Sequence, residues 1–297
     1  MIQETGASAA FIRDTCDEEG IEVVTVPASK MKVITKSKKK SDKRDAFQLA
    51  WHSLKDNLPE AVYIPTRKER SLRELVTAQE RFRKGRTAIA NGVRGQLKGI
   101  GLVLPAGTFS TVLGWERLLE RDMPEILQRI IGLSYSVWLA QSEALEATEK
   151  EVRALTAKDD LVRRVMTIPG VGLACASALR AYHGDPSRFR GVRAVVSYAG
   201  FCPSQRDSGE RRRHGRITKE GPSRLRSVYV QAANGLIARN FAGHPKWKNW
   251  YERILHRTGC RNKAVVALAR RLYVLSYHVA RSGGVFDPAL EEGQHKH

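Results

Sequence analysis

The sequence predicts an α/β segment followed by a mostly helical chain. Short apolar runs rich in β-branched residues, at 21–26 and 61–65, alternate with helical patterns near the N-terminus. Apolar residues then recur at helical spacing through 67–100 and again at about 115–158. We therefore expect three segments, which are residues 1–100, a helical linker or coiled coil at 101–160, and a helical domain at 161–297.

The elements of the first segment follow from local patterns. Residues 6–19 predict a helix, and "IEVVTV" (21–26) predicts a buried strand closed by a proline. The stretch "DAFQLAWHSL" has apolar residues at helical spacing, with Ser41 or Asp42 available as its N-cap. "AVYIP" (61–65) predicts another short strand that ends at its proline.

Residues 67–100 predict one long helix whose apolar stripe runs along a strongly basic surface. The basic residues are Arg67, Lys68, Arg70, Arg73, Arg81, Arg83, Lys84, Arg86 and Arg94. They form either a solvated helix face or a contact with nucleic acid. A loop rich in glycine and proline (99–107) separates this helix from the helical stretch at 115–158. Helices of this length often bridge domains or pair between subunits.

The third segment is predicted to be mostly helical, with a second apolar helix at 263–279. Its first part, residues 161–182, predicts two helices joined by the turn "IPGVG", in which Gly170 and Gly172 permit a tight bend. The N–H groups of this turn and of the next helix N-terminus could hold one phosphate. The pattern is similar to a helix-hairpin-helix, which contacts the DNA backbone without sequence preference. The alternative is an ordinary turn between helices.

Composition narrows the class of partner. The chain of 297 residues has 51 Lys and Arg against 31 Asp and Glu, which gives a net charge of +20. This charge favours a nucleic-acid partner, because basic side chains that bind phosphates release the counterions of those phosphates. Its four cysteines are scattered without a CxxC pair, which argues against a zinc site or a disulfide framework. No apolar run reaches the length of a membrane span. We expect a soluble, cytoplasmic protein with no membrane partner.

Acidic residues at the start of a predicted helix indicate a metal site. Asp42 and Asp45 lie three residues apart and so share one helix face, where both carboxylates could reach a divalent ion for phosphodiester chemistry. Glu4 is a candidate third ligand. The basic residues alongside, which could hold a DNA backbone, are Lys38, Lys39, Lys40, Lys43 and Arg44. The alternative is an N-cap with a nearby surface acid.

The stretch "SQRDSGERRRHGRITKEG" (204–221) combines serines with many cations. Gly209 would leave Ser208 on an exposed, flexible turn, from which its hydroxyl could attack a phosphodiester. The cations that could stabilise the transition state are Arg206, Arg211, Arg212, Arg213, Arg216 and Lys219. His214 is the only nearby base, and the carboxylates of the first segment are better candidates for that role. The alternative is a solvated basic loop.

Four stretches together resemble a known family. They are "QETGASAAF", "KSKKKSDKRDAFQLA", a block from "IPGVGLACASALRAY" to "SRLRSVYVQAA", and "NKAVVALARRLYVLSYHV". In this order they are similar to insertion-sequence transposases of the IS110 family, which are relatives of the Piv DNA invertase. The resemblance covers nearly the whole chain, and the block at 168–234 is its most specific part.

The resemblance implies a fold and a mechanism. The first segment would be a RuvC-like, RNase H-type domain whose DEDD tetrad binds Mg²⁺, with Glu4, Asp42 and Asp45 as tetrad members. The third segment would supply Ser208, or less plausibly Ser204, as a nucleophile that forms a phosphoserine link to DNA. A structured bridge RNA would pair with donor and target DNA, and protomers would form a homotetramer or homodimer near the bacterial nucleoid.

One tetrad member has no counterpart in this sequence. In the family the first aspartate precedes the glutamate by tens of residues on an opening strand, and here Met1 lies three residues before Glu4. The chain is then an N-terminally shortened sequence, a decayed copy, or a protein whose opening strands come from another polypeptide. Three functions follow: a bridge-RNA-guided transposase, a catalytically impaired RNA- and DNA-binding remnant, and a metal-dependent nuclease that forms no covalent intermediate.

Overall fold

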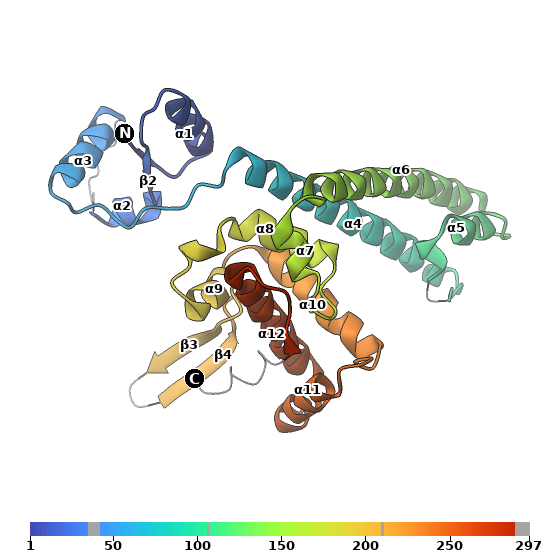
Figure 1. Ribbon diagram of the computed structural model, residues 1–297. Coiled ribbons are helices and arrows are strands. Elements are labelled where there is room, and N and C mark those ends of the chain that lie inside the picture. The colour runs from blue at the N-terminus through green and yellow to red at the C-terminus, as the bar shows by residue number, and fades with distance from the viewer. Residues whose placement is uncertain (35–41, 106, 209–210, 289–297) are drawn as a thin grey trace. The chain divides into compact units, whose positions relative to one another are not determined.

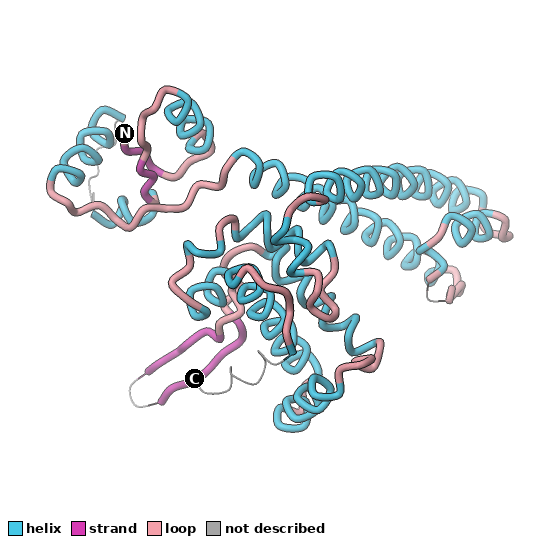
Figure 2. Tube along the Cα trace, viewed as in Figure 1, coloured by secondary structure: helices cyan, strands magenta, loops and turns pink. Residues whose placement is uncertain are grey.

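The computed structural model describes residues 1–34, 42–105, 107–208 and 211–288, with the backbone alone at 32–34, 42, 205–208 and 211–214. Within these ranges the protein is mostly helical and has four short strands (Figures 1 and 2). None of the helices described is long and apolar enough to cross a membrane. The chain divides into two compact units, Met1–Arg70 and Ser71–His297.

The first unit is built on a small parallel sheet. Strand β1 (Ile2–Glu4) pairs with β2 (Val24–Val26), and helix α1 (Ala9–Glu18) connects them. The buried Gln3 side chain donates to the Ala9 carbonyl at 2.9 Å and to the Thr25 hydroxyl at 3.0 Å, so it ties α1 to both strands. Helices α2 (Ala28–Ile34) and α3 (Asp42–Leu54) complete the unit, and α3 lies against β1.

The predicted strand at 61–65 is wrong, because these residues belong to no strand in the described structure. The N–H of Val62 donates to the Thr25 carbonyl at 2.7 Å, beside β2. A strand needs a repeated ladder, however, and Pro65 has no N–H to contribute. The Pro65 carbonyl accepts instead from the guanidinium of Arg70 at 2.6 Å, at the start of the next helix.

Two long helices dominate the N-terminal part of the second unit. They are α4 (Arg67–Gly99), whose first residues belong to the first unit, and α6 (Glu125–Thr156), with η1 (Thr108–Ser110) and α5 (Val112–Leu119) between them. The helical stretch predicted at 115–158 is therefore two helices, because Pro124 cannot continue the first and instead caps the second. Trp115 and Trp138 are buried between these helices, with ring centroids 5.6 Å apart.

The remaining helices pack around α12 (Arg261–Ser282), which buries half of its residues. The helices packed around it are α7 (Asp160–Val165), α8 (Leu173–His183), η2 (Pro186–Arg188), α9 (Val192–Tyr198), α10 (Ser223–Ala238) and α11 (Pro245–Thr258). Tyr229, Tyr273 and Tyr277 are fully buried at the centre. This confirms the prediction of a mostly helical chain and gives the third segment a large apolar core.

A buried ion pair joins α4 to this helical body. Arg224, at the start of α10, is 4% exposed and donates to the Glu80 carboxylate on α4. Burial opposes the charge on Glu80, but a hydrogen bond from Lys84 and the charge of Arg224 outweigh it and lower the pKa of this carboxyl. Because Leu72 and Val76 also join the core of the body, the long helices are fixed to it by charge and by packing.

Candidate functional site

The three predicted metal ligands lie in the first unit, on β1 and α3. Glu4 is the last residue of β1, and the carboxyl ends of parallel strands are where ligands bind in open α/β sheets. Asp42 is the first residue of α3, Asp45 lies in its first turn, and α3 contacts β1. Among the residues with described side chains no three acidic, histidine or cysteine groups form a metal cluster, and the Asp42 side chain is outside that description.

The basic residues predicted beside these carboxylates are placed in part. Lys43 and Arg44 are exposed in the first turn of α3. Lys38, Lys39 and Lys40 lie outside the described residues.

Another acid of this unit, Asp14, has a structural role. Its carboxylate accepts from the guanidinium groups of Arg70 and Arg13, and these bonds, that of Arg70 first, lower the pKa of Asp14. Asp14 therefore holds α1 against the start of α4 and is not available as a further metal ligand.

The basic stretch predicted as a flexible loop is an antiparallel hairpin. Strand β3 (Pro203–Ser208) pairs with β4 (Arg211–Ile217), and the hairpin projects from the helical body (Figure 1). The register sets Ser208 opposite Arg211 and Arg206 opposite Arg213. Ser208 therefore ends its strand at the tip of a regular ladder, rather than within an irregular segment.

This register sorts the residues of the hairpin between its two faces. Paired residues share a face, and residues two apart along a strand return to it. Ser208 is thus on one face with three cations, while the other face has Asp207, Arg212 and His214. The three cations are Arg206, Arg211 and Arg213. The strand register therefore places His214 and Ser208 on opposite faces of the hairpin.

The base of the hairpin is anchored by backbone packing and one arginine. Gly200 and Gly221 have positive φ angles of 67° and 81°, and a Cβ on either would lie about 2 Å from a carbonyl oxygen. The Arg226 guanidinium donates to the carbonyls of Ala199, Glu220 and Gly221 at 2.9, 3.0 and 3.2 Å. These contacts lie just before the start of β3 and just after the end of β4, so they hold both strands at the base of the hairpin. No sequence pattern pointed to Arg226, because its acceptors are backbone groups.

Ser204 lies near this base, where the ladder is irregular. The register shifts between Pro203 and Gln205, which places Ser204 at a bulge. Its hydroxyl packs so closely on Gly215 that a Cβ at that position would lie 2.3 Å from the Ser204 Oγ. Arg216 and Lys219, further along, are exposed. Ser204 therefore lies at the base of the hairpin, whereas Ser208 is the last residue of β3, at its tip.

The two glycines of the predicted phosphate-binding turn differ in their surroundings. Gly170 has a φ of +78°, and a Cβ there would lie 2.6 Å from the Leu236 side chain on α10. Gly172, the N-cap of α8, has a φ of −96° and open space around its Cα. Gly170 is required for core packing, whereas Gly172 is exposed at the N-terminus of α8.

Two family models match the chain. The one described as the transposase IS116/IS110/IS902 family matches residues 162–252, which include most of α7, all of α8 to α10 and the β3–β4 hairpin. A second, for the DEDD transposase of IS110, matches residues 1–102, which include the three predicted metal ligands. The two models together take in every residue predicted to contribute to the site.

Individual relatives align over most of the chain. The transposase for insertion sequence element IS1111A of Coxiella burnetii is 28% identical over 263 residues, which are 85% of this chain and 69% of the relative. The transposase for insertion sequence element IS1328 of Yersinia enterocolitica is 24% identical, over 96% of this chain and 85% of the relative. The pilin gene-inverting protein of Moraxella lacunata is 24% identical, over 85% and 70%.

Proposed function

Because the chain belongs to the IS116/IS110/IS902 family of transposases, we propose that it cuts and rejoins DNA at the ends of an insertion sequence through a covalent phosphoserine link. Ser208 is the proposed nucleophile, and Glu4, Asp42 and Asp45 are the proposed ligands of Mg²⁺. The first unit is proposed to be a RuvC-like domain, which agrees with its parallel β1–α1–β2 arrangement.

The observation that carries this proposal is the hairpin register. Ser208 shares its face with three arginines, so a phosphodiester that approaches its hydroxyl meets cations on the same side. Attack by the hydroxyl places extra negative charge on the non-bridging oxygens, and fixed cations stabilise that charge. The anchored base restricts the two strands, which would lower the ordering cost of the reaction.

The proposed chemistry conserves the energy of the phosphodiester bond. The Ser208 oxygen forms a bond to phosphorus, the bond from phosphorus to the leaving deoxyribose oxygen breaks, and the serine proton passes to a base. A hydroxyl at the end of another strand then attacks the phosphoserine, and the serine oxygen leaves and regains a proton. One ester is exchanged for another at each step, so strand exchange requires no nucleotide hydrolysis.

The proposed ligands have the right chemistry for magnesium, because carboxylate oxygens are the side-chain ligands that this hard cation prefers. Bound Mg²⁺ would polarise the scissile phosphate and lower the pKa of a coordinated hydroxyl. Glu4 at the end of β1 and Asp45 in the first turn of α3 would hold the ion, with Asp42 beside them. Lys43 and Arg44, both exposed, would bind the adjoining backbone.

A bridge-type noncoding RNA is the proposed source of sequence specificity. A net charge of +20 supports binding of more than one nucleic-acid strand. The open N-terminus of α8 at Gly172 adds a place for a backbone phosphate, where it needs no base contacts. Purifying the full chain from cells that carry the whole element, and sequencing the RNA that remains bound, tests this part of the proposal.

The catalytic proposal is tested by trapping the covalent intermediate. The full chain is incubated with Mg²⁺, copurified RNA and labelled DNA that contains the element ends, and the products are separated after boiling in detergent. Wild type and Ser204→Ala should give a labelled adduct of protein and DNA, whereas Ser208→Ala should give none. Glu4→Gln and Asp45→Asn should reduce the adduct while leaving DNA binding intact.

Two other functions predict different results. A metal-dependent nuclease would cleave DNA at the normal rate in Ser208→Ala and would yield no adduct with any variant. An RNA- and DNA-binding remnant would bind both nucleic acids and leave the DNA uncut in every variant. The serine mechanism is abandoned if cleavage survives the loss of the Ser208 hydroxyl.

We propose self-association through α6 as well. Ile126, Ile130, Leu133 and Val137 are spaced four, three and four residues apart, and their side chains are 67%, 38%, 71% and 52% exposed. This spacing gives one apolar seam over residues 126–137, in the first part of the 32-residue helix α6, and a second helix covers such a seam in a coiled coil. A second copy of the chain would present the same seam, which supports a homodimer or a homotetramer.

A further inference from the structure

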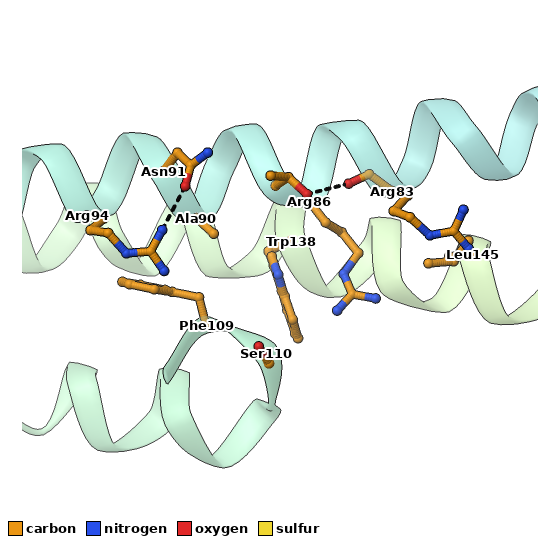
Figure 3. A pocket seen from close by; sticks show the side chains of 10 residues that line it. Arg83, Arg86, Ala90, Asn91, Arg94, Phe109, Ser110, Trp138 and Leu145 are labelled. Atoms are coloured by element: carbon orange, nitrogen blue, oxygen red, sulfur yellow. Dashed lines mark hydrogen bonds between the residues drawn. The ribbon is translucent and has the colours of Figure 1, made fainter. Parts of the chain in front are cut away.

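A pocket in the second unit lies between α4, α6 and η1, and its residues belong neither to the β3–β4 hairpin nor to the predicted metal ligands. It has a volume of about 370 Å³, at the small end of the range of about 300–1,000 Å³ typical of ligand pockets. Its lining includes three arginines of α4, Arg83, Arg86 and Arg94, together with Phe109 and Trp138 (Figure 3).

Two of these guanidinium groups lie over aromatic rings. The Arg86 guanidinium is 4.7 Å from the centroid of Trp138, and that of Arg94 is 5.0 Å from the centroid of Phe109. Both rings are more than nine-tenths buried and are fixed by the core. A cation held over a fixed ring loses little further freedom when it binds a ligand, so this pocket is preorganised for an anion.

The charges around the pocket are unbalanced. Arg83 donates to Glu149 at 3.1 Å, while a second terminal nitrogen of its guanidinium is buried without a hydrogen-bond partner. Arg94 donates to the neutral Asn91 side chain at 2.7 Å. Within the described part of the chain neither Arg86 nor Arg94 forms a salt bridge. Three cations therefore face one carboxylate, which leaves a net positive pocket.

We propose that this pocket binds a phosphodiester of single-stranded nucleic acid, at a site separate from the β3–β4 hairpin and the carboxylates. Guanidinium groups match phosphate oxygens in shape and charge and bind them through paired hydrogen bonds. The volume suits one nucleotide unit, and Asn91 and Ser110 line the pocket with polar groups that can meet its sugar or base. The nucleic-acid class rests on the proposed function, because an unspecified anion would fit the charge alone.

The test measures binding rather than catalysis. Fluorescence anisotropy of a labelled 20-nucleotide strand, as DNA and as RNA of the same sequence, is measured with wild type and with the double variant Arg86→Gln, Arg94→Gln. We expect at least about a tenfold rise in Kd, from the loss of charged hydrogen bonds to phosphate. The slope of log K against log salt should also fall by about 0.7 for each phosphate that the variant no longer neutralises.

A matched control separates the pocket from general charge. Arg81 is exposed on the same helix and does not line the pocket, and Arg81→Gln should change Kd less than twofold. Circular dichroism establishes that each variant is folded. Arg86→Lys and Arg86→Gln are also compared as single variants. The lysine keeps the charge but loses the planar group, so the Kd of Arg86→Lys should lie between those of wild type and Arg86→Gln. The rise in Kd for each charge removed is compared between the double variant and Arg81→Gln. If this rise is the same for both variants with both strands, the pocket proposal is wrong.

The two nucleic acids identify the source of the phosphate. A larger loss with RNA assigns the pocket to a guide strand, a larger loss with DNA assigns it to a substrate strand, and equal losses assign it to either backbone. The adduct experiment with Ser208→Ala is independent of this result. If the wild-type protein gives no adduct but the double variant binds nucleic acid more weakly than wild type, the pocket proposal stands and the catalytic proposal is wrong.

Discussion

Substituting Gly170 should destabilise the protein for reasons that can be worked out from its surroundings. An alanine there must adopt a φ of +78°, which costs an L-residue about 1–2 kcal/mol. Its Cβ would also lie 2.6 Å from the Cγ of Leu236, a buried side chain on α10, and such overpacking costs about 1–3 kcal/mol. Reduced freedom of the unfolded chain returns about 0.4–1 kcal/mol. These contributions together give an expected loss of about 1–4.6 kcal/mol, with a midpoint near 3 kcal/mol, in the free energy of unfolding of Gly170→Ala.

Gly172 provides the matched control two residues away. Its φ of −96° suits any residue, and a Cβ there meets no atom within 4 Å, so Gly172→Ala should leave the free energy of unfolding within about 0.5 kcal/mol of wild type. Urea unfolding of the full chain, followed by circular dichroism, measures both variants. The reasoning is refuted if Gly170→Ala is as stable as wild type, or if Gly172→Ala loses as much as Gly170→Ala.

Buried groups and exposed surfaces lead to three more expected outcomes. Burial lowers the pKa of His183 from 6.5 to about 3, so between these pH values the unfolded chain binds a proton that the folded chain does not. The free energy of unfolding should therefore fall by up to about 1.4 kcal/mol for each pH unit from 6.5 down to about 3. His183→Gln should lose this dependence in urea titrations at pH 6.5 and pH 5. Glu80→Gln should cost about 3 kcal/mol, since it leaves the Arg224 charge buried without a counterion, and the double variant with Arg224→Met should recover part of that loss in the same assay. Leu133→Glu should shift the full chain toward monomers in analytical ultracentrifugation, whereas Glu146→Gln, an exposed change on the same helix, should not.

Much of the fold is encoded in local patterns. The helix predicted at 67–100 is α4, Arg67–Gly99, because its apolar stripe repeats without interruption until glycines follow. The predicted apolar helix at 263–279 lies within α12 for the same reason. The prediction of a strand at 61–65 was wrong because a β-branched run forms a strand only where a partner strand pairs with it along its length.

The candidate site was predictable only in its residue types. The sequence indicated Ser208 amid arginines and three carboxylates near helix and strand ends, and the resemblance to the transposase family explained why both occur in one chain. It also predicted a flexible loop where the structure has a hairpin, because a run of charged residues has no apolar alternation to indicate strands. The division of the chain into three segments and the roles of the site residues remain predictions.

Local patterns were enough to predict the long helices, the basic character of the chain and its resemblance to the transposase family, since helical periodicity and motif blocks are properties of neighbouring residues. The residues that share a hairpin face with Ser208 follow from the strand register, which depends on pairing between two segments. The packing of Gly170 on Leu236 and the position of Arg86 over Trp138 are likewise contacts between residues dozens of positions apart. Such contacts depend on how whole helices pack, and no local pattern in the chain specifies that packing.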